Sequence, residues 1–250
     1  MNGLNGSKEE NKGCFYGVGV GPGDPELVTL KAARLIEQAD VITYLSNESG
    51  ESQARTIVER LLVDGVKEVP IIMPMRDDPR IGEAVYDEAA RIIESELNLG
   101  LNVVFLCEGD PLFFGSFAYL LERLETKFTC VSIPGISSPH AASSALNLPL
   151  TMMKESFSVI SGRHQDDFIE QTLTSYDSVI IMKAGRSRPR LLQILSKTQR
   201  SADAQYLEYI GRENQLIVTD INSLNQYEKG PYFSLFIVTK QSDTENGRRK

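Results

Sequence analysis

Short apolar runs recur along the first half of the chain, with amphipathic segments between them. Residues 103–107 (VVFLC) are uninterruptedly apolar, which is typical of a strand covered on both faces of a sheet. The alternation of such runs with helical segments continues to residue 133 and predicts a parallel α/β sheet. The expected strands are residues 14–19, 41–45, 69–73, 103–107 and 129–133.

The intervening helices are predicted from start signals and from apolar periodicity. Asp24 can cap a helix whose first turn holds Pro25 and Glu26, a proline and an acidic residue that both suit that position. Apolar residues at helical spacing then mark one buried face for each helix. These sets are Val28, Ala32, Leu35, Ile36 and Ala39; Ala54, Ile57, Val58, Leu61 and Leu62; Ile81, Ala84, Val85, Ala89, Ile92 and Ile93, after a start at Asp78-Pro79; and Phe117, Leu120, Leu121 and Leu124.

The second half follows a different pattern. Expected strands at 157–161 and 179–183 have helices between and after them, whereas those at 205–209, 216–220 and 232–239 have little helix between them. Consecutive strands with short links favour antiparallel pairing, so this sheet is expected to be mixed. We therefore predict two α/β lobes, residues 13–135 and 136–240, joined near Pro134-Gly135. The polar segments 1–12 and 241–250 are expected to be disordered tails.

Composition narrows the function classes. The 250 residues carry a net charge of −8, which argues against general nucleic-acid binding. No apolar run approaches the roughly 20 residues of a membrane helix, and the amino terminus lacks the apolar core of a signal peptide. Three scattered cysteines and two distant histidines predict reduced thiols and no protein-bound metal. We expect a cytoplasmic protein.

Residues 17–25, GVGVGPGDP, join the first strand to the first helix, where ligands bind in open α/β sheets. The four glycines let a ligand approach the backbone without interference from a Cβ. Pro22 stands where the dinucleotide fingerprint G-x-G-x-x-G requires its last glycine, and no Gly-Lys-Ser/Thr follows, so neither a dinucleotide fingerprint nor a P-loop is present. The alternative interpretation is a tight turn with no ligand.

Two further motifs follow later strands. EGDPLFFGS at residues 108–116 offers an acidic side chain and two adjacent phenylalanines, which would be exposed unless something covers them. IPGISSP at residues 133–139 places Ser137 or Ser138 as the cap of a helix that Pro139 opens. Each motif alone also fits a purely structural role, as a loop over the core or a helix cap.

A fourth motif, KAGRSRPR at residues 183–190, gathers four cations at a strand end and a helix start. Positive charge there opposes the helix dipole, which a purely structural design would avoid. On an acidic protein this cluster indicates an anionic ligand or partner. The alternative is a solvated loop.

Taken together, the order and spacing of these motifs resemble the tetrapyrrole methylase family, which uses S-adenosylmethionine (SAM). The resemblance covers residues 14–240. It implies two lobes with SAM in the cleft between them, usually in a homodimer, and S-adenosylhomocysteine as product. Carried over by motif, the cofactor-binding residues are Pro22, Glu108, Gly109, Asp110, Phe113, Ser137, Ser138, Met182, Lys183, Ile210 and Gly211. Tyr209-Ile210-Gly211 stands where several relatives have Asn-Gly-Thr, so any side-chain contact from that threonine is lost here.

Three segments are most similar to family members that methylate carbon 20 of precorrin-2 or cobalt-factor II in cobalamin biosynthesis: GPGDPELVTLKA, PIIMPM and PYFSLFIV. Overall likeness slightly favours cobalt-factor II, although no residue decides it. Methyl transfer from a sulfonium is an in-line displacement with a neutral leaving group. Catalysis is then mainly orientation, and no catalytic base is assigned.

Such a substrate carries eight carboxylates, which an acidic enzyme must bind through local cations. The candidate substrate-binding residues are Tyr44, Arg76, Arg80, Arg186, Arg188 and Arg190. The competing hypotheses are a methylase of the same fold acting on uroporphyrinogen, a later precorrin, ribosomal RNA or diphthamide; a SAM-binding module without turnover; and a Rossmann dehydrogenase.

Overall fold

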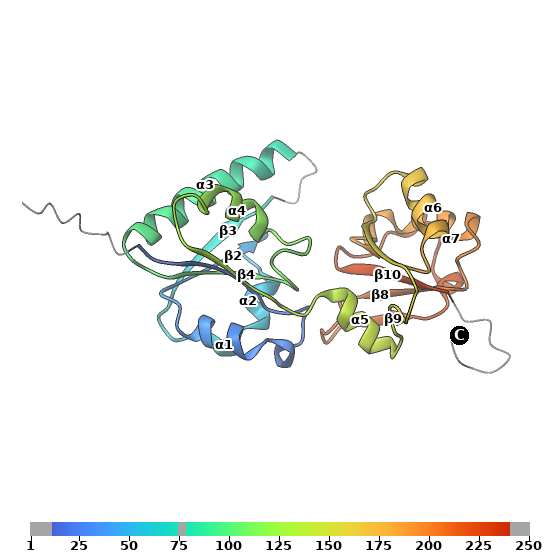
Figure 1. Cartoon of the computed structure of the whole chain (residues 1–250), viewed down its shortest axis with the longest axis horizontal. Helices are drawn as coiled ribbons and strands as arrows, with labels where there is room; N and C mark the ends of the chain where they lie inside the picture. Colours follow the sequence, from blue (N-terminus) through green and yellow to red (C-terminus); the bar gives the residue numbers. More distant parts are fainter. Residues whose placement is uncertain (1–11, 75–78, 241–250) are drawn as a thin grey trace, which may run out of the picture. The chain divides into compact units, whose positions relative to one another are not determined.

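The computed structural model describes residues 12–74 and 79–240. The chain forms two compact units that divide between Ser137 and Ser138, and each unit is built on its own five-stranded sheet (Figure 1). Apart from Lys12, the two expected tails lie outside the described residues. Within the described part, no helix is long and apolar enough to cross a membrane.

The sheet of the first unit is entirely parallel, with the order β3-β2-β4-β1-β5, as the alternating pattern predicted. Its strands are β1 (Phe15–Gly19), β2 (Val41–Ser46), β3 (Lys67–Ile72), β4 (Val103–Cys107) and β5 (Cys130–Ile133). The central strand β4 is buried along its whole length. Its apolar run is therefore explained by helices on both faces.

Helices cover the two faces of this sheet in pairs (Figure 1). Phe105 and Phe117 belong to the core on one face, packed with α3 and α4, whereas Ile36 and Leu106 belong to the core on the other face with α1 and α2. The helices are α1 (Leu30–Glu37), α2 (Gln53–Ile57), α3 (Pro79–Asn98) and α4 (Phe117–Leu124), with short 3₁₀ turns η1 (Pro25–Leu27) and η2 (Glu59–Leu61).

The expected helix start at Asp24 is wrong. Asp24 does cap, since its carboxylate accepts a hydrogen bond from the Glu26 amide at 2.8 Å, but it caps only the single turn η1. Val28 is extended, and Thr29 then caps α1 by accepting from the Ala32 amide at 3.2 Å. The α-helix itself begins at Leu30, because the chain is extended after the η1 turn and Thr29 then acts as a second capping residue.

The second unit holds a mixed sheet in the order β6-β7-β10-β8-β9, which confirms the predicted mixture. Strands β6 and β7 are parallel, and the other neighbours are antiparallel. The strands are β6 (Phe157–Ser161), β7 (Ser178–Met182), β8 (Ala204–Glu208), β9 (Leu216–Val218) and β10 (Ser234–Thr239). The helices are α5 (Ser138–Leu146), α6 (Asp166–Ser175) and α7 (Arg188–Lys197), with 3₁₀ turns η3 (Gly185–Ser187) and η4 (Ile221–Ser223).

The direction of these strands defines one functional edge. Because β6 is parallel to β7, and β10 is antiparallel to both β7 and β8, the carboxyl ends of β6, β7 and β8 meet the amino end of β10. Helices α6 and α7 contribute to a single core with this sheet through Ile169, Leu173, Leu191 and Leu195. That core fixes the strands, so the loops at the edge are held on a rigid base.

Candidate functional site

Three loops of the first unit meet at the carboxyl ends of the neighbouring strands β4, β1 and β5. They are the glycine-rich turn, the EGDP loop and the IPGISS segment that the sequence singled out. Gly21 and Gly109 form an antiparallel bridge in which the Gly109 amide donates to the Gly21 carbonyl oxygen at 2.8 Å. The Val20 amide also donates to the Cys107 carbonyl oxygen at 2.9 Å. The first two motifs are therefore one connected structure.

Glycine is required here because the three backbones touch. A Cβ on Gly135 would lie 2.1 Å from the Gly109 carbonyl oxygen, and a Cβ on Gly19 would lie 2.6 Å from that same oxygen. Gly109 itself has φ +66°, a left-handed conformation that other residues rarely adopt. This edge of the sheet consequently presents main-chain groups with few side chains in front of them.

Asp110 ties the EGDP loop to the IPGISS segment. One carboxylate oxygen accepts from the Leu112 amide at 2.9 Å, and the other accepts from the Gly135 amide at 3.2 Å. Each oxygen has a second lone pair, so Asp110 can still accept a hydrogen bond from a ligand. Its first role is to join two loops that belong to different strands.

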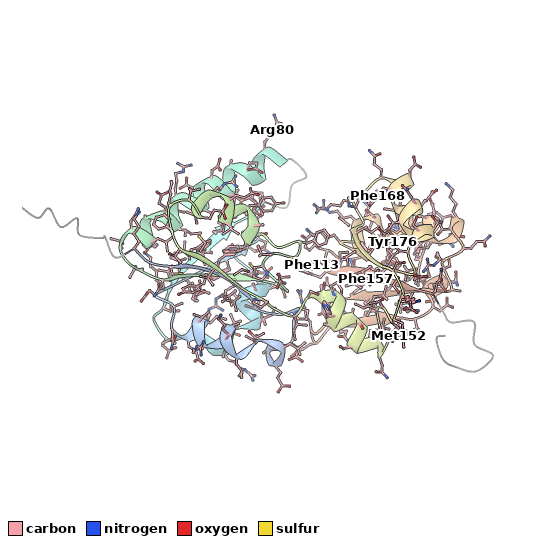
Figure 2. The ribbon with its side chains drawn as sticks, viewed as in Figure 1. Arg80, Phe113, Met152, Phe157, Phe168 and Tyr176 are labelled. Atoms are coloured by element: carbon pink, nitrogen blue, oxygen red, sulfur yellow. The ribbon has the colours of Figure 1, made fainter. Side chains whose placement is uncertain are left out.

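An apolar rim follows Asp110. Phe113 lies in the loop between β4 and α4 (Figure 2), and its ring meets the Phe114 ring edge-on, with the ring centroids 5.2 Å apart. Leu112 and Phe114 are exposed, and Phe114 has a left-handed φ of +57°. An exposed aromatic residue in a strained backbone conformation is unusual for a plain loop and is typical of a binding loop.

The remaining expected cofactor residues of this group flank the same edge. Pro22 and Ser137 are buried, whereas Glu108 and Ser138 are half-buried. Helix α5 begins at Ser138, so Pro139 is its second residue rather than its first. The structure therefore brings the three loops that carry these seven predicted residues to one edge of the sheet.

The expected residues of the second unit also share one edge. Met182 is the last residue of β7 and Lys183 follows it, whereas Ile210 and Gly211 follow β8. Loops from neighbouring strands hold them: the Gly162 amide donates to the Met182 carbonyl oxygen at 2.7 Å, and the Tyr209 amide donates to the Phe233 carbonyl oxygen at 2.9 Å. Lys183 and Tyr209 both have left-handed φ values, +55° and +51°.

The sequence interpretation missed an aromatic and cationic group at this second edge. The guanidinium carbon of Arg212 lies 3.9 Å from the centre of the Phe233 ring and 5.8 Å from the centre of the Tyr209 ring. Tyr209 and Arg212 follow β8, whereas Phe233 precedes β10, so no single local motif contains the group. It also missed the close backbone approach of Gly19 and Gly135, which only the three-dimensional contact between strands reveals.

Arg188 is a correction to the expected substrate-binding set. Its side chain is 7% exposed and pairs with Glu208 at 3.3 Å and Glu228 at 3.5 Å. Its Nε also donates to the Glu228 carbonyl oxygen at 2.8 Å. The positive charge is matched by acidic residues from distant parts of the chain, so Arg188 holds the unit together rather than offering charge to a ligand.

Arg190 needs the same correction. It forms an ion pair with Asp166 and donates to the carbonyl oxygens of Gly162 at 2.6 Å and His164 at 2.9 Å. The expected cation cluster is thus partly neutralised within the fold. Arg186, in η3, is exposed and stays in the predicted set.

The Tyr44 side chain is buried in the fold rather than exposed to a ligand. It is 5% exposed, and its hydroxyl donates to Glu68 at 2.8 Å. Arg55 pairs with the same carboxylate through two hydrogen bonds, at 2.7 and 3.1 Å. Burial and the Glu68 carboxylate raise the pKa of the Tyr44 hydroxyl, which keeps it protonated as a donor. Tyr44 therefore has a structural role, which corrects its expected place among the substrate-binding residues.

The last two expected substrate cations lie near the start of α3. Arg80 projects from the first turn of this helix and is exposed (Figure 2). Arg76 lies outside the described residues. Among residues 12–74 and 79–240, no group of three metal-ligating side chains is present.

Comparison with known proteins identifies the family of the chain. The family model for Tetrapyrrole (Corrin/Porphyrin) Methylases matches residues 14–225, and the chain belongs to this family. It is 36% identical over 237 residues to the cobalamin biosynthesis protein CobIJ of Mycobacterium tuberculosis, covering 91% of this chain. The chain spans only 46% of the length of that relative.

Two further relatives match over most of their length. The chain is 33% identical over 239 residues to a precorrin-2 C(20)-methyltransferase from Sinorhizobium, covering 92% of this chain and 97% of the relative. The crystal structure of uroporphyrin-III C-methyl transferase from Thermus thermophilus, complexed with S-adenosyl homocysteine, has a TM-score of 0.67 at 22% identity. That match covers 91% of this chain and 98% of the other, and it establishes the fold.

Proposed function

We propose that the chain is a SAM-dependent methyltransferase that methylates carbon 20 of precorrin-2 or cobalt-factor II in cobalamin biosynthesis. The observation that carries this proposal is the joining of three loops through Gly21, Gly109, Asp110 and Gly135, in a member of the tetrapyrrole methylases. The carbon-20 position is supported by the 33% identity to the Sinorhizobium enzyme over 97% of its length.

The residues at the first edge fit such a cofactor. A Cβ on Gly19 or Gly135 would clash with the backbone of a neighbouring loop, and Gly109 has a left-handed φ of +66°, so main-chain amides and carbonyls line the edge. Main-chain groups of this kind suit the amino-acid end and the ribose of SAM, and Phe113 supplies an apolar surface. In this proposal Pro22, Glu108, Gly109, Asp110, Phe113, Ser137 and Ser138 hold the cofactor from the first unit.

The second unit contributes the adenosine contacts in the same proposal. Met182, Lys183, Ile210 and Gly211 lie on loops fixed by main-chain hydrogen bonds between neighbouring strands. When bound, SAM supplies an electrophilic methyl group. The chain's own residues contribute rigid positioning, because loops tied at several points hold both reactants in a productive geometry.

Substrate binding falls to exposed cations. Of the expected residues that the structure describes, the exposed arginines Arg80 and Arg186 are the proposed carboxylate contacts. Arginine suits a carboxylate-rich macrocycle because its planar fork binds carboxylates through two parallel hydrogen bonds. Whether the natural substrate carries cobalt is decided by no residue of the chain, and both forms belong in the assay.

The proposal includes a cytoplasmic homodimer. Three aromatic side chains of β6, α6 and the turn after α6, namely Phe157, Phe168 and Tyr176, are each more than one third exposed (Figure 2). In the described part of the second unit, β6 is an edge strand that pairs with β7 alone. An exposed edge with aromatic neighbours suits a second copy of the chain. Light scattering of the purified protein measures its mass directly.

The cofactor is tested by thermal unfolding in a concentration series of S-adenosylhomocysteine, with NADH as a matched comparison. A ligand at 100 times its dissociation constant stabilises a protein by about 2.7 kcal/mol. A rise in melting temperature with S-adenosylhomocysteine alone supports the proposal. A rise with NADH alone favours a dehydrogenase, and no rise with either ligand contradicts the proposed cofactor. Binding without methylation of any tetrapyrrole indicates a SAM-binding module.

A further inference from the structure

The turn after β6 brings a second cation beside Lys183. Gly162 packs against the end of β7, where a Cβ on Gly162 would lie 3.2 Å from both the Ala184 Cα and the Lys183 carbonyl oxygen. The parallel register pairs Ser161 with Met182, so the residues that follow these two, in both loops, leave the sheet together. Arg163 therefore lies next to Lys183, and its positive charge repels the Lys183 ammonium.

This turn is held in place by hydrogen bonds that leave the Arg163 side chain out. Arg190 donates to the carbonyl oxygens of Gly162 and His164, on either side of Arg163. The Arg163 amide also donates to the Ser161 hydroxyl at 3.2 Å. The charge of Arg190 is matched by Asp166, so Arg190 fixes the turn without presenting its own charge.

The Arg163 guanidinium is exposed, and within residues 12–74 and 79–240 it has no carboxylate at ion-pair distance. Its neighbour Lys183 is half-buried and has a left-handed φ of +55°, which costs energy for any residue other than glycine. Burial, followed by the Arg163 charge, lowers the pKa of Lys183. An exposed guanidinium that lies beside a second positive charge, on a turn fixed by hydrogen bonds, is in a position that an anionic ligand stabilises.

We propose that Arg163, which lies beside Lys183, binds a carboxylate of the tetrapyrrole substrate and helps to determine which macrocycle the protein accepts. This inference rests on the proposed function and adds a residue that the motifs did not single out. The carboxylate at the methionine end of SAM is a second anionic group that could bind Arg163. The test therefore measures the two ligands separately.

The variant is Arg163→Gln, and the matched control is Lys154→Gln. Lys154 is exposed and precedes β6, whereas Arg163 follows it. Lys154→Gln therefore removes the same charge at the opposite end of this strand. Calorimetry measures S-adenosylhomocysteine affinity. A fluorescence titration with uroporphyrin, a porphyrin with eight carboxylates, measures macrocycle affinity in the presence of saturating S-adenosylhomocysteine.

We expect Arg163→Gln to weaken uroporphyrin binding about tenfold, the scale of one charge-assisted hydrogen bond. Affinity for S-adenosylhomocysteine should stay within twofold of the parent protein, Lys154→Gln should change neither affinity, and Arg163→Lys should restore part of the loss. Equal uroporphyrin affinity in Arg163→Gln and Lys154→Gln overturns the inference. So does a loss confined to S-adenosylhomocysteine, which assigns Arg163 to the cofactor. Failure of the parent protein to bind S-adenosylhomocysteine instead overturns the proposed function.

Discussion

Gly21 and Gly109 exchange two main-chain hydrogen bonds across loops that follow different strands, with the Gly109 amide donating at 2.8 Å and the Gly21 amide donating at 3.4 Å. Both residues are left-handed, with φ of +80° and +66°. The glycine-rich turn and the EGDP loop are consequently a single unit, and Asp110 extends it to Gly135. Changes at any of these positions should affect the same binding site.

Gly135→Ala should disrupt this unit. The added Cβ would lie 2.1 Å from the Gly109 carbonyl oxygen, and because that atom is backbone, neither loop can yield without moving. Overpacking of this kind costs about 1–3 kcal/mol, and affinity for S-adenosylhomocysteine should fall at least tenfold. Calorimetric titration and thermal unfolding measure both effects.

Gly82→Ala is the control for this change. Gly82 lies in α3, where an added Cβ meets nothing within 4 Å, so alanine should stabilise the helix by about 1 kcal/mol. Parent-like S-adenosylhomocysteine affinity in Gly135→Ala would show that the loops do not form the cofactor site.

Asp110→Ala should weaken cofactor binding. The substitution removes the acceptor for both the Leu112 and the Gly135 amides, so the EGDP loop loses its link to the IPGISS segment. Hydrogen bonds to a charged group are worth about 1.5–3 kcal/mol each, and affinity for S-adenosylhomocysteine should fall tenfold or more. Asp64→Ala, at an exposed position far from the loops in sequence, should leave the affinity unchanged. An unchanged affinity in Asp110→Ala would remove this residue from the site.

Arg188→Met should lower stability. The change leaves Glu208 without its cationic partner, and the Glu208 side chain is only 12% exposed. Removing one partner of a buried ion pair typically costs about 3–5 kcal/mol. Arg186→Met, at the neighbouring exposed position, should lower the melting temperature less than Arg188→Met and should weaken macrocycle binding. If the two variants had equal melting temperatures, Arg188 would not have the structural role assigned here.

Asp177 should give the protein part of its resistance to acid. The Ser156 amide and hydroxyl, each at 2.8 Å, and then Lys240 at 3.0 Å, hold the pKa of Asp177 below its ordinary value. The unfolded chain then binds more protons than the folded chain as the pH falls. The stabilisation is therefore complete above the unfolded pKa of about 3.9 and is lost as the pH drops below it.

Asp177→Asn should reduce stability at pH 7 and flatten the decline of stability between about pH 5 and pH 2, where the carboxylate titrates. Urea unfolding at a series of pH values measures this slope. Asp64→Asn, at an exposed position, is the matched control variant. A parent-like slope in Asp177→Asn would show that this carboxylate is not linked to folding.

Much of the fold could be predicted because its strands are short, buried and apolar. The expected strand at 103–107 coincides with β4, and the run at 157–161 coincides with β6. The position of β10 between β7 and β8 could not be predicted in this way. The apolar pattern of β10 predicts that this strand is buried. It does not predict which strands lie beside β10, because β7 and β8 are distant in the sequence.

The same distinction between local and long-range contacts applies to the residues of the candidate site. Gly21, Gly109 and Asp110 could be singled out because each lies in a local motif at a strand end. Arg188 and Arg190 looked like free cations because their partners Glu208, Glu228 and Asp166 come from other segments. Arg163 could not be singled out for the converse reason, since its significance depends on Lys183, which follows the neighbouring strand β7.

The central claim is tested most directly by incubating the protein with SAM labelled with ¹³C in the methyl group, together with precorrin-2 or cobalt-factor II. Nuclear magnetic resonance of the product locates the label. One labelled methyl group on carbon 20 of either substrate, with S-adenosylhomocysteine formed in equal amount, is the predicted result. A label on another carbon, or no transfer to either macrocycle by protein that binds S-adenosylhomocysteine, would contradict the proposed activity.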